Sequence, residues 1–279
     1  MSSTNAFHRL ELLVGEESIK ELAKARVILF GVGGVGSWCA EALVRSGIHN
    51  LTIVDSDLVC ITNSNRQVQA TSLSVGKVKV TELARRLREI NPEAQITSLQ
   101  KIYDRTTAAE FDLSQYDYVI DAIDSLSSKV ELIMNASASG TVLFSALGAS
   151  AKLDPTRIRI SSIWKSNKCP LGRLVRKRLR QRGYKGDFLC IWSDEQLDGY
   201  EKESTCGTGA CVCPKTVNSA DQDDAAFAHE WCSSKKKING SAVHITGTFG
   251  FMLSGLVIQD IESRNRNRDA VSLPQPAEV

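Results

Sequence analysis

A glycine-rich segment follows an apolar run near the start of the chain, in RVILFGVGGVGSW at residues 26–38. Glycines in a turn between a strand and a helix let backbone N–H groups approach a phosphate. The glycines with this spacing are Gly31, Gly33, Gly34 and Gly36. Asp55 ends the next apolar segment, LTIVD, where a carboxylate can bind the hydroxyls of a ribose. These features suit NAD, FAD and ATP alike, and by themselves they leave hydride transfer as the default chemistry.

Polar and basic residues follow that second segment, in DSDLVCITNSNRQVQATSLSVGKVKV. The first helix already holds the pyrophosphate of a dinucleotide, whereas Asn63, Arg66 and Lys79 suit a triphosphate with a charged leaving group. A later apolar segment ends in VIDAIDS, so Asp121 and Asp124 could hold Mg²⁺ against the triphosphate. The ordered set therefore favours ATP.

Each of these residues also has a purely structural interpretation. Arg66 and Lys79 could be solvated surface charges, and Asn63 could shape a turn. Asp124 is well placed to cap the helix that SLSSKVELI predicts. Taken singly, each interpretation is sufficient, and only the ordered set favours a nucleotide site.

The elements that must position these residues alternate between strand-like and helical segments from Arg26 to about Gly148. The strand-like segments are VILF, LTIVD, AQITSL, YDYVIDAID and TVLFSA, and the helical ones are SWCAEALVRSG, GKVKVTELARRLREIN and SKVELIMNASAS. Such alternation predicts an α/β, Rossmann-like fold with a mostly parallel sheet and helices on both faces. Ligands of such sheets bind at the carboxyl ends of the strands, where the glycines and carboxylates fall.

The pattern changes after about Gly148. DPTRIRISSIW predicts a strand, PLGRLVRKRLRQRG a basic helix, and residues 194–240 an irregular, cysteine-bearing insertion. SAVHITGTFGFMLSGLVIQDI predicts a strand, with His244 packed in it, followed by an apolar helix. We therefore expect one domain over residues 1–262, with the basic helix and the insertion at 164–240 in its C-terminal extension, and a disordered tail at 263–279.

Composition excludes several classes of protein. The formal net charge of +2 gives no whole-protein signal for nucleic acid, and no apolar run approaches the roughly 20 residues that a membrane span needs. The N-terminus lacks the charged-then-apolar pattern of a signal peptide, so we expect a cytoplasmic protein whose cysteines do not form disulfides. Cys169 and Cys190 are expected to be buried structural residues rather than nucleophiles.

Four cysteines lie close together in the insertion and could form a tetrahedral zinc site that stabilises it. They are Cys206, Cys211, Cys213 and Cys232. Their spacing, C-x4-C-x-C followed by a distant fourth cysteine, departs from common zinc motifs. The alternative is a redox-sensitive loop.

The basic helix concentrates positive charge on one short segment. Its basic residues are Arg173, Arg176, Lys177, Arg178, Arg180 and Arg182. This density suits the phosphate backbone of a nucleic acid. The alternative is a solvated face of an amphipathic helix whose leucines point inward.

The ordered motifs GVGGVG, LTIVDSD, NSNRQ, VGKVKV and IDAIDS resemble those of the adenylating superfamily that activates ubiquitin-like proteins. This superfamily includes the bacterial molybdopterin-synthase and thiamine-pathway adenylyltransferases, and the resemblance covers roughly residues 7–150. It implies an ATP- and Mg²⁺-dependent homodimer in which a substrate carboxylate attacks the α-phosphate of ATP and releases pyrophosphate.

The resemblance also implies a role for each matching residue. Asp55 would bind the ATP ribose, Asn63, Arg66 and Lys79 would contact the phosphates, and Asp124 would position Mg²⁺. Besides the glycines, the implied nucleotide-binding set is Asp55, Asp57, Asn63, Arg66, Lys79 and Asp124.

An N-terminal arginine of these homodimers often reaches into the partner's site. In this sequence, Arg9 of FHRLELLVG stands where that residue is expected. The catalytic set that the resemblance implies is therefore Arg9, Arg66, Lys79 and Asp124.

Within the superfamily, three features favour the branch of tRNA threonylcarbamoyladenosine dehydratases. This branch activates the carboxylate of a modified adenosine next to the anticodon and closes it into a ring. The chain has no CxxC motif, with which the carrier-activating bacterial enzymes usually hold zinc, and it carries the basic helix. Its segments from DPTRIRISSIW to INGSAVHITGTFGFMLSGLVIQDI also resemble this branch, which extends the resemblance to about residue 262.

The implied function is an ATP- and Mg²⁺-dependent dehydratase that acts on tRNA. The alternative is an adenylyltransferase that activates the C-terminal glycine of a ubiquitin-like sulfur carrier. A third interpretation is a non-catalytic nucleotide- or tRNA-binding module, against which the complete set of phosphate and metal ligands argues. A sulfur-transfer or cysteine desulfurase system stays open as a protein partner.

Overall fold

The computed structural model describes residues 6–197 and 240–272. Seven strands form one sheet in the order β3-β2-β1-β4-β5-β7-β6, in which β6 runs antiparallel to β7 and the other neighbours are parallel. The strands are β1 (Arg26–Phe30), β2 (Asn50–Val54), β3 (Gln95–Leu99), β4 (Tyr118–Asp121), β5 (Val142–Ala146), β6 (Ile158–Ser162) and β7 (Leu189–Ser193). The predicted mostly parallel α/β sheet is confirmed.

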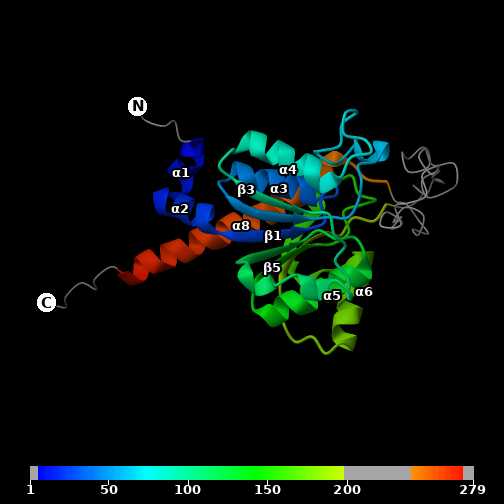
Figure 1. The fold of residues 1–279 in the computed structure, drawn as a ribbon. Coiled ribbons are helices and arrows are strands. Elements are labelled where there is room, and N and C mark those ends of the chain that lie inside the picture. The colour runs from blue at the N-terminus through cyan, green and yellow to red at the C-terminus, as the bar shows by residue number, and fades with distance from the viewer. Residues whose placement is uncertain (1–5, 198–239, 273–279) are drawn as a thin grey trace.

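Helices cover both faces of this sheet (Figure 1). They are α1 (His8–Val14), α2 (Glu16–Lys24), α3 (Gly36–Arg45), α4 (Lys79–Ile90), α5 (Leu126–Ser139), α6 (Pro170–Gln181) and α8 (Val243–Ser272). Short 3-10 helices lie at Ile61–Asn63, Ala108–Glu110, Leu113–Gln115, Pro155–Arg157 and Ile163–Lys165. Among the described residues, no helix is both long and apolar enough to cross a membrane.

The side chains of β1 divide between two hydrophobic cores. Val27 and Leu29 pack with α3, α4 and α8, whereas Ile28 and Phe30 pack with α5 and α6. All four are fully buried, which explains why this strand is a continuous apolar run rather than an alternating one. This buried interior strand therefore fixes the position of the glycine segment that follows it.

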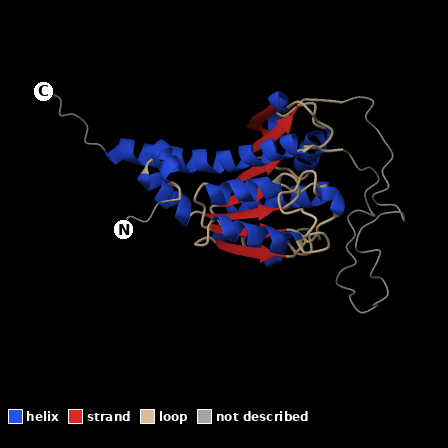
Figure 2. Cartoon of the chain, turned by 90° about the horizontal axis from the view of Figure 1, so that it is seen from above, coloured by secondary structure: helices blue, strands red, loops and turns tan. Residues whose placement is uncertain are grey.

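The C-terminal helix α8 corrects two predictions. It begins at Val243 and contains His244, so the strand expected in SAVHIT is wrong. It also continues through Ser272, so the disordered tail expected from Ser263 is wrong for residues 263–272. Figure 2 shows α8 running along the sheet and extending beyond it.

Packing against α3 explains why this segment is helical. Phe249, Leu253 and Val257 recur at helical spacing and are fully buried in the core that α3 shares. The two helices approach closely at Gly250, where an added Cβ would lie 2.5 Å from the carbonyl oxygen of Val35. The β-branched residues at its start favour a strand only locally, and this tertiary contact outweighs them.

The carboxyl ends of β1, β2 and β4 meet at one edge of the sheet. Phe30 pairs in register with Val54 of β2 and with Asp121 of β4. The chain leaves β1 toward β2 on one side, and β4 lies on the other side, so the strand order reverses at β1. This point, outside the carboxyl ends of the strands, is where open α/β sheets bind ligands.

Candidate active site

The glycine turn between β1 and α3 requires its glycines. Gly31 has a φ of +88°, and a Cβ on it would lie 2.8 Å from the carbonyl oxygen of Ala122. A Cβ on Gly36 would lie 1.8 Å from the carbonyl oxygen of Gly31. Helix α3 begins at Gly36, and no side chain of its N-cap residue, Val35, bonds to its first N–H groups. The turn therefore has the geometry of a helix N-terminus that receives a phosphate.

Asp55, Asp57 and Lys79 form a charged group beside this turn, which we call the open edge. The Nζ of Lys79 lies 2.8 Å from Asp57 Oδ2 and 3.9 Å from Asp55 Oδ1. Asp55 also accepts hydrogen bonds from the N–H groups of Val32 (2.8 Å) and Asp57 (2.9 Å). The side chain of Lys79 is 7% exposed, whereas that of Asp57 is 34% exposed. The carboxylate of Asp57 is thus partly open to solvent, whereas the side chain of Asp55 is only 12% exposed.

Electrostatics keep the ammonium of the open edge charged. Burial alone would lower the pKa of Lys79, but the carboxylates of Asp55 and Asp57 outweigh burial and raise it. Burial raises the pKa of the Asp55 carboxyl, against the opposing effect of Lys79. A triphosphate entering here would meet a cation that is held in place by carboxylates at the rim.

Arg66 lies over the glycine turn, while its contact with phosphate stays a prediction. A Cβ on Gly34 would lie 3.3 Å from both Cγ and Cδ of Arg66. The Nη1 of Arg66 donates to the carbonyl oxygen of Thr62 (2.7 Å) and to Asn65 Oδ1 (2.9 Å). Arg66 is therefore not a fully solvated surface charge.

Asn63 supports the turn that carries Arg66. It is buried, and its Oδ1 accepts a hydrogen bond from the N–H of Cys60 (3.0 Å). This contact matches the turn-shaping interpretation of Asn63, while its contact with phosphate stays a prediction.

The two aspartates of VIDAIDS have different positions. Asp121, the last residue of β4, is fully buried, and its Oδ2 lies 2.6 Å from Lys129 Nζ. The interpretation of Asp121 as a metal ligand is therefore wrong. Asp124 is exposed in the turn after β4, and its charge contributes to the raised pKa of Lys79. Ser125 rather than Asp124 is the N-cap residue of α5, so the capping interpretation of Asp124 is wrong.

Two buried lysines, Lys129 and Lys152, were not predicted from the sequence. Lys129 is fully buried and bonds to Asp121, to Ser145 Oγ (3.4 Å) and to the carbonyl oxygen of Ala146 (2.9 Å). Lys152 is 5% exposed and donates to the carbonyl oxygens of Glu195 (2.8 Å) and Ser193 (3.3 Å). A signal for Lys129 was present, because it shares the helical stripe of the buried Leu132 and Ile133.

Arg9 lies far from the site within one chain. It is exposed on α1, and Phe7, two residues earlier, packs against Gly47 and against the ring of His49. His49 immediately precedes β2, so α1 lies at the amino ends of the strands. The structure therefore does not bring Arg9 together with Arg66, Lys79 and Asp124 in a single chain.

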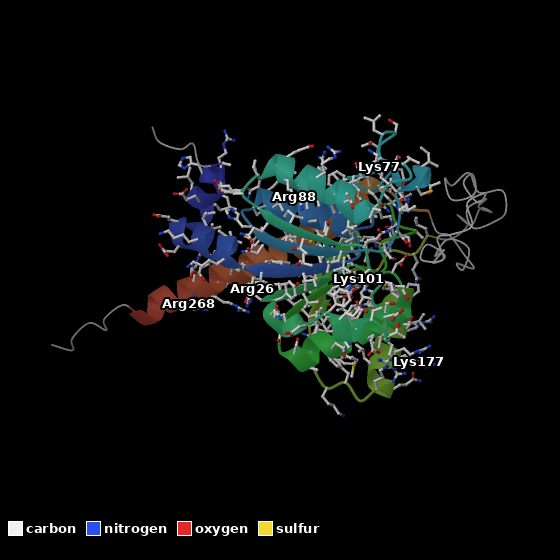
Figure 3. All side chains as sticks on the ribbon, in the orientation of Figure 1. Arg26, Lys77, Arg88, Lys101, Lys177 and Arg268 are labelled. Carbon is white, nitrogen blue, oxygen red and sulfur yellow. The ribbon has the colours of Figure 1, made fainter. Side chains whose placement is uncertain are left out.

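The basic residues of α6, together with its C-cap residue Arg182, fall into two groups. Three contact the protein: Arg176 donates to Ser166 Oγ, Arg180 stacks over Trp164 at 5.2 Å, and Arg182 pairs with Glu131 at 2.6 Å. The other three are exposed and have no ion pair with any residue that the structure describes: Arg173, Lys177 and Arg178. Figure 3 shows Lys177 on the outer side of α6.

The cysteine predictions divide between described and undescribed residues. Cys169 and Cys190 are buried and free, as expected, and burial raises the pKa of Cys190 to about 12. Cys206, Cys211, Cys213 and Cys232 lie outside the described residues. Within residues 6–197 and 240–272, no group of three or more His, Cys, Asp or Glu side chains is arranged to hold a metal ion.

His244 does not lie in a strand. It is exposed in the first turn of α8, and its Nε2 lies 2.9 Å from the carbonyl oxygen of Leu153. The prediction of a packed strand histidine is wrong. The residue instead ties the start of α8 to the loop that follows β5.

Proteins of known function and structure are similar to this chain. Residues 7–191 match the pattern of the ThiF family. The tRNA threonylcarbamoyladenosine dehydratase of Bacillus subtilis is 41% identical over 189 residues, which are 68% of this chain and 74% of that protein. Its counterpart in Escherichia coli is 34% identical over 86% of this chain and 87% of that protein. A crystal structure of the Escherichia coli enzyme in complex with ATP covers 94% of this chain and 96% of that one, with a TM-score of 0.75 and 31% identity.

Proposed function

The chain belongs to the ThiF family, and on that premise we propose that it is an ATP-dependent tRNA threonylcarbamoyladenosine dehydratase. One observation carries the assignment of ATP: the open edge lies beside the glycine turn, at the point where the strand order reverses. The similarity to the tRNA threonylcarbamoyladenosine dehydratases supports the choice of substrate. A dinucleotide needs no buried cation there, whereas the triphosphate of ATP does.

The reaction begins with activation of a carboxylate. An oxygen of the substrate carboxylate attacks the α-phosphorus of ATP, the bond to the bridging oxygen of the β-phosphate breaks, and pyrophosphate leaves. The protein's contribution is to hold the groups in line and to neutralise the charge that develops on the leaving group. Lys79 and Arg66 supply that positive charge, and the glycine turn supplies backbone N–H groups.

The second step releases AMP. A nucleophilic atom of the same threonylcarbamoyl side chain attacks the activated carbonyl carbon, and AMP departs with the bonding electrons. Because the nucleophile is already tethered to the activated carbon, no covalent relay through a cysteine is required. The buried positions of Cys169 and Cys190 agree with this route.

Mg²⁺ fits the site as a shared ion. Magnesium is usually bound through one or two carboxylates together with substrate phosphates and water. Asp124, exposed in the turn that follows the carboxyl end of β4, offers such a carboxylate. Bound there, the ion would neutralise charge on the phosphates.

We further propose a cytoplasmic homodimer that completes its site with Arg9 of the partner subunit. Helix α1 has no buried residues, and Leu12 and Leu13 on it are each 75% exposed. A second copy would cover these leucines and bring α1 to another chain's site. The adenylating domain would then be the unit formed by residues 1–262.

The tRNA would bind along the outer side of α6. The N-cap residue of this helix, Cys169, lies beside the loop after β5. A Cβ added to Gly148 in that loop would be 3.6 Å from Cys169 Sγ. The helix therefore starts near the carboxyl edge of the sheet, and Arg173, Lys177 and Arg178 extend positive charge away from it.

Mass spectrometry of nucleosides tests the function directly. Threonylcarbamoyl-modified tRNA is incubated with the protein, with and without Mg²⁺-ATP. We expect an ATP-dependent loss of one water from the modified adenosine. An unchanged nucleoside, together with adenylation of a matched sulfur carrier, would overturn the proposal in favour of the carrier-activating alternative.

A further inference from the structure

A closed group of polar side chains lies behind the site, between β4, β5 and α5. It consists of Lys129, Asp121 and Ser145, which we call the buried lysine cluster, and all three are fully buried. Lys129 Nζ lies 2.6 Å from Asp121 Oδ2, and Ser145 Oγ donates to the same oxygen at 2.6 Å. The ammonium also donates to the carbonyl oxygen of Ala146. No ligand can reach these atoms without displacing the core.

The cluster holds the turn that carries Asp124. The other oxygen of Asp121, Oδ1, accepts a hydrogen bond from the N–H of Ile123 at 3.1 Å. Ile123 lies in the turn at residues 122–125, which joins β4 to α5. Asp124 is the next residue of the same turn. One carboxylate is thus bonded to the lysine on one side and to the turn on the other.

The same turn supports the glycine turn. A Cβ added to Gly31 would lie only 2.8 Å from the carbonyl oxygen of Ala122, so the two turns are in close contact. A shift of residues 122–125 would therefore move both the metal carboxylate of the proposed site and the first glycine of the phosphate turn.

An ion pair at this place is better explained by positioning than by stability. Apolar side chains of similar volume would fill the space at comparable or lower free energy, because burying two charges costs desolvation. A carboxylate with several directed hydrogen bonds instead fixes one arrangement of the backbone. Here that backbone is the turn with Asp124.

We propose that Lys129 is a positioning residue for nucleotide activation, which acts through Asp121 to present Asp124 to the metal–nucleotide complex. The inference rests on the nucleotide site of the proposed function, but not on the identity of the acid that is activated. Lys129 touches neither nucleotide nor substrate.

The test measures ATP binding to the purified full chain by calorimetry, in Mg²⁺ and in EDTA, without tRNA. Loss of an outer-shell partner typically weakens metal affinity by about 10–100-fold. For Lys129→Met we expect ATP affinity in Mg²⁺ to fall by at least about tenfold, with a much smaller change in EDTA. We also expect faster amide hydrogen exchange at residues 122–126.

Two further variants separate positioning from general destabilisation. In Lys129→Met/Asp121→Asn the uncompensated charge is gone and the asparagine oxygen can still accept from Ile123, so affinity in Mg²⁺ should recover most of its loss. Arg86→Met breaks the pair that Arg86 makes with the buried Glu41 between α4 and α3 (2.6 Å), and it should not alter the effect of Mg²⁺. If Lys129→Met does not fold, the double variant and its hydrogen exchange decide the question.

The proposal is overturned if Lys129→Met binds ATP as the wild type does, or if it loses affinity equally in Mg²⁺ and in EDTA. It is also overturned if the double variant, folded, stays as weak in Mg²⁺ as the single one. A wild type that binds Mg²⁺-ATP yet leaves modified tRNA unchanged would contradict the proposed function alone, and the role of Lys129 could still be measured.

Discussion

The open edge and the buried lysine cluster contain nearly the same groups in different surroundings. In each, a lysine with almost no exposed surface pairs with an aspartate at the carboxyl end of a strand or just after it, at 2.8 Å for Lys79 and 2.6 Å for Lys129. Asp57 of the open edge is 34% exposed, whereas Asp121 of the cluster is fully buried. The exposure of the carboxylate, not that of the lysine, distinguishes the two.

That difference decides what each pair can do. A partly exposed carboxylate can be hydrated, so its lysine can turn part of its charge toward an incoming phosphate. A fully enclosed carboxylate cannot change its partner without leaving a bare charge in the core. The open edge is therefore suited to binding and the cluster to holding the backbone, and four predictions test this division.

Breaking the enclosed pair should have the largest effect on stability. Removing one partner of a buried ion pair typically costs about 3–5 kcal/mol, because the other charge stays buried. We expect Lys129→Met to lower the free energy of unfolding by that amount, measured by urea denaturation. Lys20→Met is the matched control: it removes an exposed lysine that pairs with Glu16 and Glu17, and exposed pairs contribute only about 0–1 kcal/mol. Equal losses in the two variants would contradict the assignment.

Breaking the open edge should instead affect chemistry. Loss of one preorganised electrostatic group commonly lowers turnover by about 10²–10³-fold. We expect Lys79→Met to lose that much ATP-dependent product while tRNA binding and the fold persist, because Asp57 can be solvated. Lys77→Met is the control two residues away, since Lys77 is exposed and its amine lies 3.7 Å from Glu82. Unchanged turnover in Lys79→Met would show that Lys79 does not contact the leaving group.

The sequence was sufficient to predict the open edge because its signals are local and ordered. The glycine spacing is typical of a strand-to-helix turn. Asp55 directly follows the end of β2, and Lys79 is the first residue of α4. Parallel pairing then brings the strand ends together without further information. The order of strands and helices up to residue 148 could be predicted for the same reason.

The remaining features depend on contacts between distant segments. Lys129 needed Asp121 and Ser145 to be recognised as a pair, and a single lysine in a helix gives no sign of its partner. The start of α8 is rich in β-branched residues, and only its packing on α3 makes it helical. Arg9 lies at the opposite end of the strands, so the role proposed for it would need a second chain, which no local pattern describes.

The basic helix repeats the contrast between groups already bound within the fold and groups facing outward. Charge reversal of the outward residues Arg173, Lys177 and Arg178 should weaken tRNA binding by about tenfold or more and reduce the slope of affinity against salt by up to about three. ATP affinity should not change. The measurement is a titration of labelled tRNA at several salt concentrations.

A matched control carries the same change of charge elsewhere. Lys20, Lys24 and Arg85, which lie exposed on α2 and α4, are reversed to Glu in one variant. It should keep the wild-type salt slope. If both variants lose the same slope, tRNA responds only to the total charge, and α6 is a solvated face.

The smallest effect concerns a third buried lysine, Lys152, which donates hydrogen bonds to the carbonyl oxygens of Ser193 and Glu195. Burial lowers the pKa of Lys152, although Cys169 and Glu195 oppose the shift, whereas the pKa of Lys79 is raised. A lowered folded-state pKa means that, as the pH rises toward about 10.5, the folded state releases its proton before the unfolded state does. The free energy of unfolding of the wild type should therefore rise with pH relative to Lys152→Met, by at most about 1.4 kcal/mol per pH unit. The difference in free energy of unfolding between the wild type and Lys79→Met should stay constant until the pH exceeds about 10.5. A lysine whose folded-state pKa is raised loses its contribution to stability only above that value. Urea denaturation at pH 7 and pH 10 measures both differences, and a parallel pH dependence in the two comparisons would show that the carboxylates do not set the charge of these lysines.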